Sequence, residues 1–154
     1  MGRRGLGRTW PNPSVGCVIV SDGRIVGKGC TGDGGRPHAE VVALQQAGLS
    51  AKGATAYLTL EPCSHFGQTP PCAQALIEAG IYRVVGAMND KDPRVNGQGF
   101  EMLRNAGLEV LTGVAREEAE EDHRGFFKRI MKNSPYITLK LAASLDGRLA
   151  TASG

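Results

Sequence analysis

Residues 37–80 read PHAEVVALQQAGLSAKGATAYLTLEPCSHFGQTPPCAQALIEAG, and this stretch predicts a helix, a strand and a second helix. The first helix is expected over His38–Ala47, because apolar side chains recur on one face and a glycine follows as a stop. The alternating run Ala54–Leu60 predicts a strand. The second helix is expected over Pro71–Ala79, again with a glycine after it.

Elements on either side of this stretch continue the alternation of strands and helices. Two apolar runs joined by Asp22-Gly23 predict an opening β-hairpin. Further strands are expected at Arg83–Met88, Glu109–Leu111 and Tyr136–Leu141. Helices are expected between them, at Phe100–Ala106 and Glu117–Met131. This order predicts an α/β layered domain, in which helices that follow strands begin at one edge of the sheet. Met1–Thr9 shows no periodicity and is expected to be a frayed start or the remnant of a longer helix.

The bulk composition is that of an ordinary globular chain. At 154 residues with 41% hydrophobic residues, one domain with a sizeable core is expected. The net charge of +3 is compatible with a small phosphorylated substrate, and an aromatic content of 5% does not suggest a stacking surface for single-stranded nucleic acid. We find no secretory signal and no run of eighteen apolar residues, so a cytoplasmic protein without membrane contact is expected.

The four cysteines are expected to be reduced thiols, since the chain carries no sign of secretion. Cys17 and Cys30 lie in the two runs of the hairpin, where buried cysteine acts as a small hydrophobic residue. Regular pairing across the turn sets Cys17 opposite Lys28. The other two cysteines, Cys63 and Cys72, each follow a proline.

His38, Cys63 and Cys72 form a set of zinc-type ligands with Glu40 beside the imidazole. A structural zinc site uses four protein ligands, whereas a catalytic site uses three and leaves one position open. The set of three therefore favours a catalytic zinc, with Glu40 as the carrier of the water proton. A structural zinc site remains an alternative, in which His65 would be the fourth ligand.

The expected positions of these residues suit the chemistry. His38 and Cys72 both stand at predicted helix starts, where unpaired N–H groups and the helix dipole favour negative charge and lower the pKa of a thiol. At a helix start, Glu40 could reach the open position on the metal without binding the metal itself. The chemistry indicated is attack of water on an amidine-like ring carbon, followed by protonation of the leaving amine.

The His-x-Glu and Pro-Cys motifs resemble those of the zinc-dependent nucleobase and nucleotide deaminases, the cytidine-deaminase-like superfamily. In that superfamily two residues commonly separate the cysteines, whereas eight separate Cys63 from Cys72. The segments around this long gap are similar to the pyrimidine deaminase family of riboflavin biosynthesis. The matching segments are Leu60–His65, Thr69–Cys72, Pro11-Asn12-Pro13 with Val15–Val20, and Gly53–Tyr57.

The resemblance implies a fold, a reaction and a set of site residues. The fold would have three layers, with a central mixed sheet, an opening hairpin and helices on both faces. The reaction would be hydrolytic deamination of 2,5-diamino-6-ribosylamino-4(3H)-pyrimidinone 5′-phosphate to the 5-amino-6-ribosylamino-uracil phosphate. His38, Cys63 and Cys72 would bind zinc, Glu40 would shuttle the proton, and Asn12 and His65 would line the substrate pocket. Related deaminases associate, so a homo-oligomer is expected.

The tail resembles the start of a reductase domain that is fused behind the deaminase in this family. The similarity lies in Pro135–Leu141 and Ala143–Arg148. We therefore expect a deaminase domain over residues 1–133 and the start of a truncated reductase domain over residues 134–154. NADPH would bind only to the missing part of that reductase, so this chain is not expected to reduce a substrate.

Two positions depart from the pattern of the family. Gln68 stands where a lysine or arginine often meets the substrate phosphate, and Asp92 stands where asparagine is frequent. Because a carboxylate would repel the phosphate, Lys91 and Arg94 are candidates for compensating its charge. Two other functions remain open: a deaminase of tRNA adenosine or of a free base, and a zinc-stabilised binding module without turnover.

Overall fold

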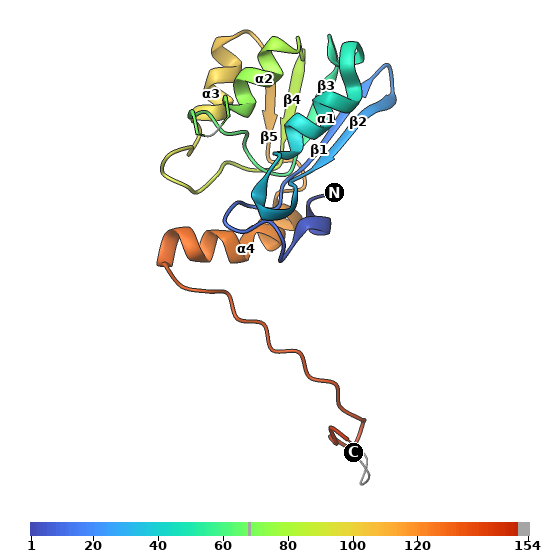
Figure 1. Ribbon diagram of the computed structural model, residues 1–154, viewed down its shortest axis with the longest axis vertical. Coiled ribbons are helices and arrows are strands. Elements are labelled where there is room, and N and C mark those ends of the chain that lie inside the picture. The colour runs from blue at the N-terminus through green and yellow to red at the C-terminus, as the bar shows by residue number, and fades with distance from the viewer. Residues whose placement is uncertain (68, 151–154) are drawn as a thin grey trace.

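The computed structural model describes residues 1–67 and 69–150 as an α/β fold built on one mixed sheet. The strands are β1 (Gly16–Ser21), β2 (Arg24–Cys30), β3 (Thr55–Leu58), β4 (Arg83–Gly86) and β5 (Glu109–Thr112). They lie in the order β2-β1-β3-β4-β5 (Figure 1). β1 pairs antiparallel with β2 and β3, and the pairs β3–β4 and β4–β5 are parallel. The α/β class, the mixed sheet and the opening hairpin are therefore confirmed.

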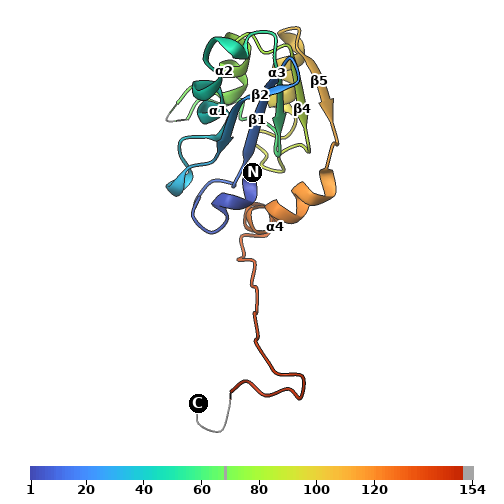
Figure 2. The same cartoon turned by 90° about the vertical axis from the view of Figure 1, so that its right-hand side faces the viewer.

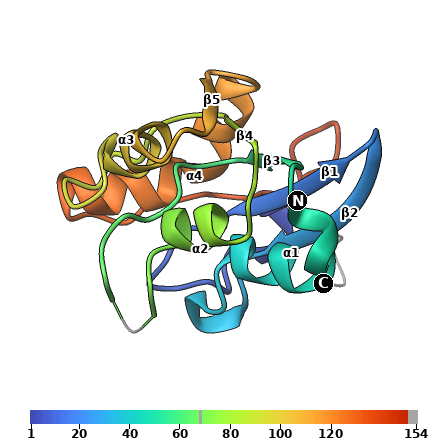
Figure 3. The ribbon, with the colours of Figure 1, turned by 90° about the horizontal axis from the view of Figure 1, so that it is seen from above.

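The helices follow the expected alternation. They are α1 (Ala39–Ala47), α2 (Cys72–Glu78), α3 (Gln98–Asn105) and α4 (Arg116–Lys132), with short 3₁₀ turns at Gly2–Gly5, Asp33–Gly35 and Gly48–Ala51. α1, α2 and α3 lie side by side on one face of the sheet (Figure 3). Side chains of the opposite face, such as Tyr57 and Leu111, stay 44% and 52% exposed. Three helices thus gather on one face, whereas the sequence predicted helices on both.

α1 approaches the sheet closely because β2 carries glycine where the helix passes. A Cβ atom at Gly29 would stand 1.9 Å from the carbonyl oxygen of Ala39, and one at Gly27 would stand 2.2 Å from that of Ala43. Only glycine allows this approach. The contact places the first turn of α1, which contains Glu40, against the hairpin of β1 and β2.

A β-bulge corrects the expected register of the hairpin. Val20 pairs with Ile25, but Ile19 pairs with Gly27, so one residue of β2 is left out of the pairing. Cys17 therefore lies opposite Gly29 rather than Lys28. A bulge inserts one unpaired residue and shifts every later pair by one position.

The N-terminal segment is packed rather than frayed. Gly2 and Gly5 are buried, and the side chain of Ser14 donates a hydrogen bond to the carbonyl of Gly2 at 2.6 Å. The guanidinium of Arg3 pairs with Asp122 of α4 at 2.6 Å. This segment therefore connects the edge of the sheet to α4, which crosses one end of the sheet (Figure 2).

Residues 134–150 contain neither helix nor strand, so the strand expected at Tyr136–Leu141 is not formed. No backbone hydrogen bond joins these six residues to another strand within the described residues, and a strand without a partner cannot form a ladder. None of the helices in the described part of the chain combines the length and the apolar character that a bilayer span requires.

His123 of α4 is 1% exposed, and neither ring nitrogen has a hydrogen-bond partner among the described residues. Burial lowers the pKa of His123, against smaller opposing effects of Asp122 and of the nearby backbone of Thr59, which does not form a hydrogen bond of good geometry with the ring. Below the ordinary histidine pKa of about 6.5, the unfolded chain therefore binds a proton that the folded chain resists. The stability due to neutral His123 is present above that pH and is lost as the pH falls.

We expect His123→Leu to weaken this pH dependence. Leucine leaves no polar atom without a partner, so the variant should be at least as stable as the wild type at pH 8. The wild type should lose more unfolding free energy than the variant between pH 7 and pH 5.5, as measured by urea denaturation. Release of a bound metal in acid would affect both proteins alike. Parallel pH profiles for the two proteins would contradict this account.

Candidate active site

Three of the predicted site residues converge on one point. His38 stands directly before α1, Cys72 is the first residue of α2, and Cys63 lies in the loop after β3. Nδ1 of His38 lies 3.2 Å from Sγ of Cys72 and 3.7 Å from Sγ of Cys63, and all three ligand atoms lie within 4.8 Å of one another. Donors on one tetrahedral zinc ion stand about 3.5–3.8 Å apart, so the spacing fits the ion.

The convergence follows from the local fold. α1 and α2 pack side by side, and the ligand atoms of His38 and Cys72 at their starts lie within 4.8 Å of each other. The backbone N–H of Cys72 donates to Sγ of Cys63 at 3.2 Å, which fixes the loop against the start of α2. The start of α2 thus directs a backbone N–H group towards a thiol, and this contact favours the thiolate.

The two thiols cannot both ionise easily without a cation. A hydrogen bond with Cys72 lowers the pKa of Cys63 to about 4. The same contact raises the pKa of Cys72 far above its usual range. A hydrogen bond with Cys63 also raises the pKa of His38. One negative charge therefore forms readily, and a divalent cation among the three donors would stabilise the second thiolate.

Glu40 is 3% exposed and occupies the second position of α1. Burial raises its pKa, with a smaller contribution from the charge of Cys63. The same cavity is lined by Glu40, His38 and Cys63. The carboxyl group of Glu40 therefore lies beside the metal-binding donors and lines a cavity that could hold substrate.

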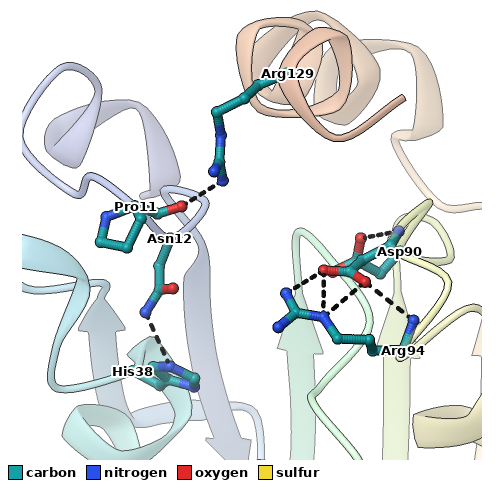
Figure 4. A network of polar contacts seen from close by, with 7 residues as sticks. Pro11, Asn12, His38, Asp90, Arg94 and Arg129 are labelled. Carbon is teal, nitrogen blue, oxygen red and sulfur yellow. Dashed lines mark hydrogen bonds and ion pairs between the residues drawn. The ribbon is translucent and has the colours of Figure 1, made fainter. Parts of the chain in front are cut away.

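That cavity has a volume of about 540 Å³ and contains both predicted substrate residues. Nδ2 of Asn12 donates to the carbonyl of Gly35 at 2.8 Å and lies 3.5 Å from Nε2 of His38 (Figure 4). His65 lines the cavity but does not belong to the cluster of ligand atoms found in the described residues. The structure therefore gives no support for His65 as a fourth ligand.

The loop after β4 brings further charge to the cavity. The guanidinium of Arg94 forms hydrogen bonds with both carboxylate oxygens of Asp92, the shortest at 2.5 Å, and lowers the pKa of that carboxyl. Nζ of Lys91 instead lies 3.6 Å from Oε1 of Glu120 in α4. Arg94 is thus the residue that balances the charge of Asp92. Gln68, the other departure from the family pattern, lies outside the described residues.

Sequence reasoning missed Glu61, which organises this loop. Its Oε2 accepts the backbone N–H groups of Asp90 at 3.0 Å and Gly97 at 2.8 Å, and its Oε1 accepts those of Gly99 at 2.8 Å and Phe100 at 3.4 Å. One buried carboxylate therefore fixes both the loop and the start of α3 relative to the strand end that leads to the cysteines. A glutamate at the end of an apolar strand, directly before Pro-Cys, was the available signal.

A neighbouring carboxyl in the same loop has a raised pKa. Asp90 is 6% exposed, and burial raises its pKa to about 6, with further contributions from Asp92 and Glu61. Asp90 lines the cavity opposite the cluster. It could therefore donate or accept a hydrogen bond with a heterocyclic ligand.

Residues 3–88 match the family described as the cytidine and deoxycytidylate deaminase zinc-binding region, which is more than half of the chain. The chain belongs to this deaminase family. Zinc is the metal of the family, and the imidazole and two thiols described above are the donors that zinc prefers. This agreement confirms the expected cofactor and the expected superfamily.

The deaminase chain is also similar to individual proteins of riboflavin biosynthesis. It is 58% identical over 154 residues to the riboflavin biosynthesis protein RibD of Escherichia coli, and this match covers 100% of the chain but 42% of RibD. Acinetobacter baumannii RibD has a TM-score of 0.86 at 53% identity, covering 99% of the chain and 43% of that protein. A deaminase/reductase of Thermotoga maritima has a TM-score of 0.88 at 44% identity, with 99% and 44% covered. The chain thus spans about two fifths of the length of these relatives.

Proposed function

We propose that the chain performs the deamination step of riboflavin biosynthesis. The substrate is 2,5-diamino-6-ribosylamino-4(3H)-pyrimidinone 5′-phosphate, and water replaces its 2-amino group to give the 5-amino-6-ribosylamino-uracil phosphate and ammonia. The observation that carries this proposal is the cluster of His38, Cys63 and Cys72, which opens on a cavity that also contains Glu40. The identity to RibD over the whole chain supports the choice of substrate.

Each residue has a defined task in the proposed reaction. His38, Cys63 and Cys72 hold the zinc ion, which supplies Lewis-acid activation of water when bound. Glu40 accepts a proton from the attacking water and returns it to the leaving amine. One C–N bond breaks and one C–O bond forms, so the step requires water and no oxidant or reductant.

Asn12 and His65 bind the pyrimidine in this proposal. The amide of Asn12 lies 3.5 Å from the imidazole of His38, so a ring hydrogen-bonded to it would lie next to the metal site. His65 reaches the same cavity from the loop between the two cysteines. Buried Asp92, its ion-pair partner Arg94 and the carboxyl of Asp90 form the facing wall.

The decisive experiment measures ammonia release from two substrates. Purified full-length protein containing this chain is incubated with the diaminopyrimidinone ribotide and, separately, with adenosine-bearing tRNA. We expect ammonia only from the ribotide, at rates in the ordinary enzyme range of about 1–10³ s⁻¹. Ammonia from tRNA alone would refute the assignment to riboflavin biosynthesis. Zinc binding without turnover of either substrate would favour a non-catalytic binding module.

We further propose that residues 134–154 begin a reductase domain, which would bind NADPH in the longer protein. The sequence similarity of this tail and the greater length of the relatives support this proposal. A cytoplasmic homo-oligomer is part of the same proposal. The reduced thiols that the metal site requires fit that compartment, and light scattering of the full-length protein would test the association.

A further inference from the structure

Arg129 of α4 reaches from outside the zinc-binding core to the rim of the cavity (Figure 4). Its Nη2 donates a hydrogen bond to the carbonyl of Pro11 at 2.6 Å. The guanidinium also lies over two aromatic rings, 4.6 Å from the centre of Trp10 and 5.4 Å from that of Phe126. A hydrogen bond and two aromatic contacts thus hold one side chain in a single orientation.

The carbonyl bound by Arg129 belongs to the peptide unit that leads into Asn12. The backbone of Asn12 also forms two hydrogen bonds with Thr9. The N–H of Asn12 donates to the carbonyl of Thr9 at 2.8 Å, and the hydroxyl of Thr9 donates to the carbonyl of Asn12 at 3.1 Å. The prolines on both sides of Asn12 restrict the backbone further. Fixing the Pro11 carbonyl therefore fixes the direction in which the Asn12 side chain points.

The other arginines at the cavity have different partners. Arg94 is paired with Asp92, and Arg36 donates to the hydroxyl of Thr69 at 2.9 Å. Neither guanidinium forms a hydrogen bond with the backbone of residues 10–13 among the described residues. Of the three arginines that line the cavity, Arg129 is thus the one that acts on the segment carrying Asn12.

We propose that Arg129 is a positioning residue for the substrate. It holds the Trp10–Pro13 segment so that the amide of Asn12 faces the pyrimidine site beside His38. This inference rests on the proposed function, because it assigns Asn12 to substrate binding. It also gives α4, which lies beyond the 3–88 region matched by the family, a part in the deaminase reaction.

Arginine suits this task better than lysine. Its planar guanidinium can stack on a ring while its N–H groups donate in the plane, whereas an ammonium group is a point charge on a flexible stem. We therefore expect Arg129→Met to lower kcat/KM roughly ten- to a hundredfold, the range for loss of a charged hydrogen bond. Arg129→Lys should recover part of that loss.

The kinetic pattern separates positioning from other roles. Loss of a contact that orients bound substrate raises KM with a smaller change in kcat, whereas a smaller folded fraction lowers kcat alone. The same factor is expected for the phosphorylated substrate and for its dephosphorylated riboside. A loss confined to the phosphorylated form would mean that Arg129 contacts the phosphate directly, and this result would overturn the proposal.

Arg124→Met is the matched control, because Arg124 lies on the same helix, pairs with Glu121 and does not line the cavity. It should keep wild-type kinetics. Zinc content should be the same in all variants, and zinc loss in Arg129→Met would indicate a structural role and contradict the inference. Unchanged kcat/KM in Arg129→Met would also contradict it.

A second readout does not depend on turnover. Trp10 is the single tryptophan of the chain, and it lies against Arg129. Arg129→Met should change the intensity and wavelength of its fluorescence, and Arg124→Met should not. Unaltered Trp10 emission in Arg129→Met would show that Arg129 does not fix the Trp10–Pro13 segment, and this result would refute the proposal for any substrate. Absence of ammonia release by the wild type would instead refute the proposed function.

Discussion

Glu40→Gln is expected to abolish most of the ammonia release while zinc stays bound. Glutamine keeps the size of the side chain but cannot accept the proton of the attacking water, and general acid–base catalysis typically contributes about 10²–10⁴-fold. The three ligand positions do not include Glu40, so the metal content should remain near one zinc per chain. We therefore expect kcat to fall by roughly 10³-fold with little change in KM.

The control for this variant is Glu101→Gln, which makes the same chemical change on the exposed surface of α3. Ammonia release and zinc content should be measured on the same preparations of both variants. Turnover that survives in Glu40→Gln would show that another group moves the proton. Loss of zinc in Glu40→Gln would show that the carboxylate helps to hold the metal, contrary to the three-ligand account.

Cys72→Ser is expected to remove both zinc and activity. A serine hydroxyl is a poor zinc ligand near neutral pH, and only His38 and Cys63 would remain from the cluster. The loss of zinc affinity should exceed the roughly 10–100-fold loss that follows substitution of residues that only contact the metal ligands. Because a ligand that binds only the folded state stabilises it, the variant should also unfold at a lower temperature than zinc-loaded wild type.

Cys30→Ser provides the matched thiol substitution away from the cluster. Cys30 is half-buried, and its sulfur lies 3.9 Å from the carbonyl of Gly2, a weak contact. Zinc per chain, measured by mass spectrometry of the elements, should remain near one in Cys30→Ser and fall well below one in Cys72→Ser. Equal zinc contents in the two variants would contradict the assignment of Cys72 as a ligand.

The zinc cluster could be predicted from sequence because its signals are local. Histidine before Ala-Glu and cysteine after proline each stand at a helix start or a strand end, and such boundaries are set by nearby residues such as Gly48. The parallel arrangement of β3 and β4 then brings Cys63 and Cys72 to the start of α1. Local boundaries and one topological rule were sufficient for this part of the site.

Other features depend on contacts between distant residues, which the sequence pattern does not encode. The carboxylate of Glu61 binds backbone groups 29 to 39 positions away, and Arg129 binds a carbonyl 118 positions away. The bulge that moves Cys17 opposite Gly29 leaves no mark in an apolar run. Gly2 packs against Ser14 because there is no room for a side chain at Gly2, and the apolar periodicity of the sequence does not show this contact.

The most direct test of the central claim is X-ray absorption spectroscopy at the zinc edge of freshly purified wild-type protein. The account predicts two sulfur ligands, one imidazole nitrogen and one lighter ligand from solvent, in agreement with the three protein donors of the cluster. A spectrum with two imidazole ligands would point to a closed site that includes His65. That result, or correctly folded protein without zinc, would contradict the account.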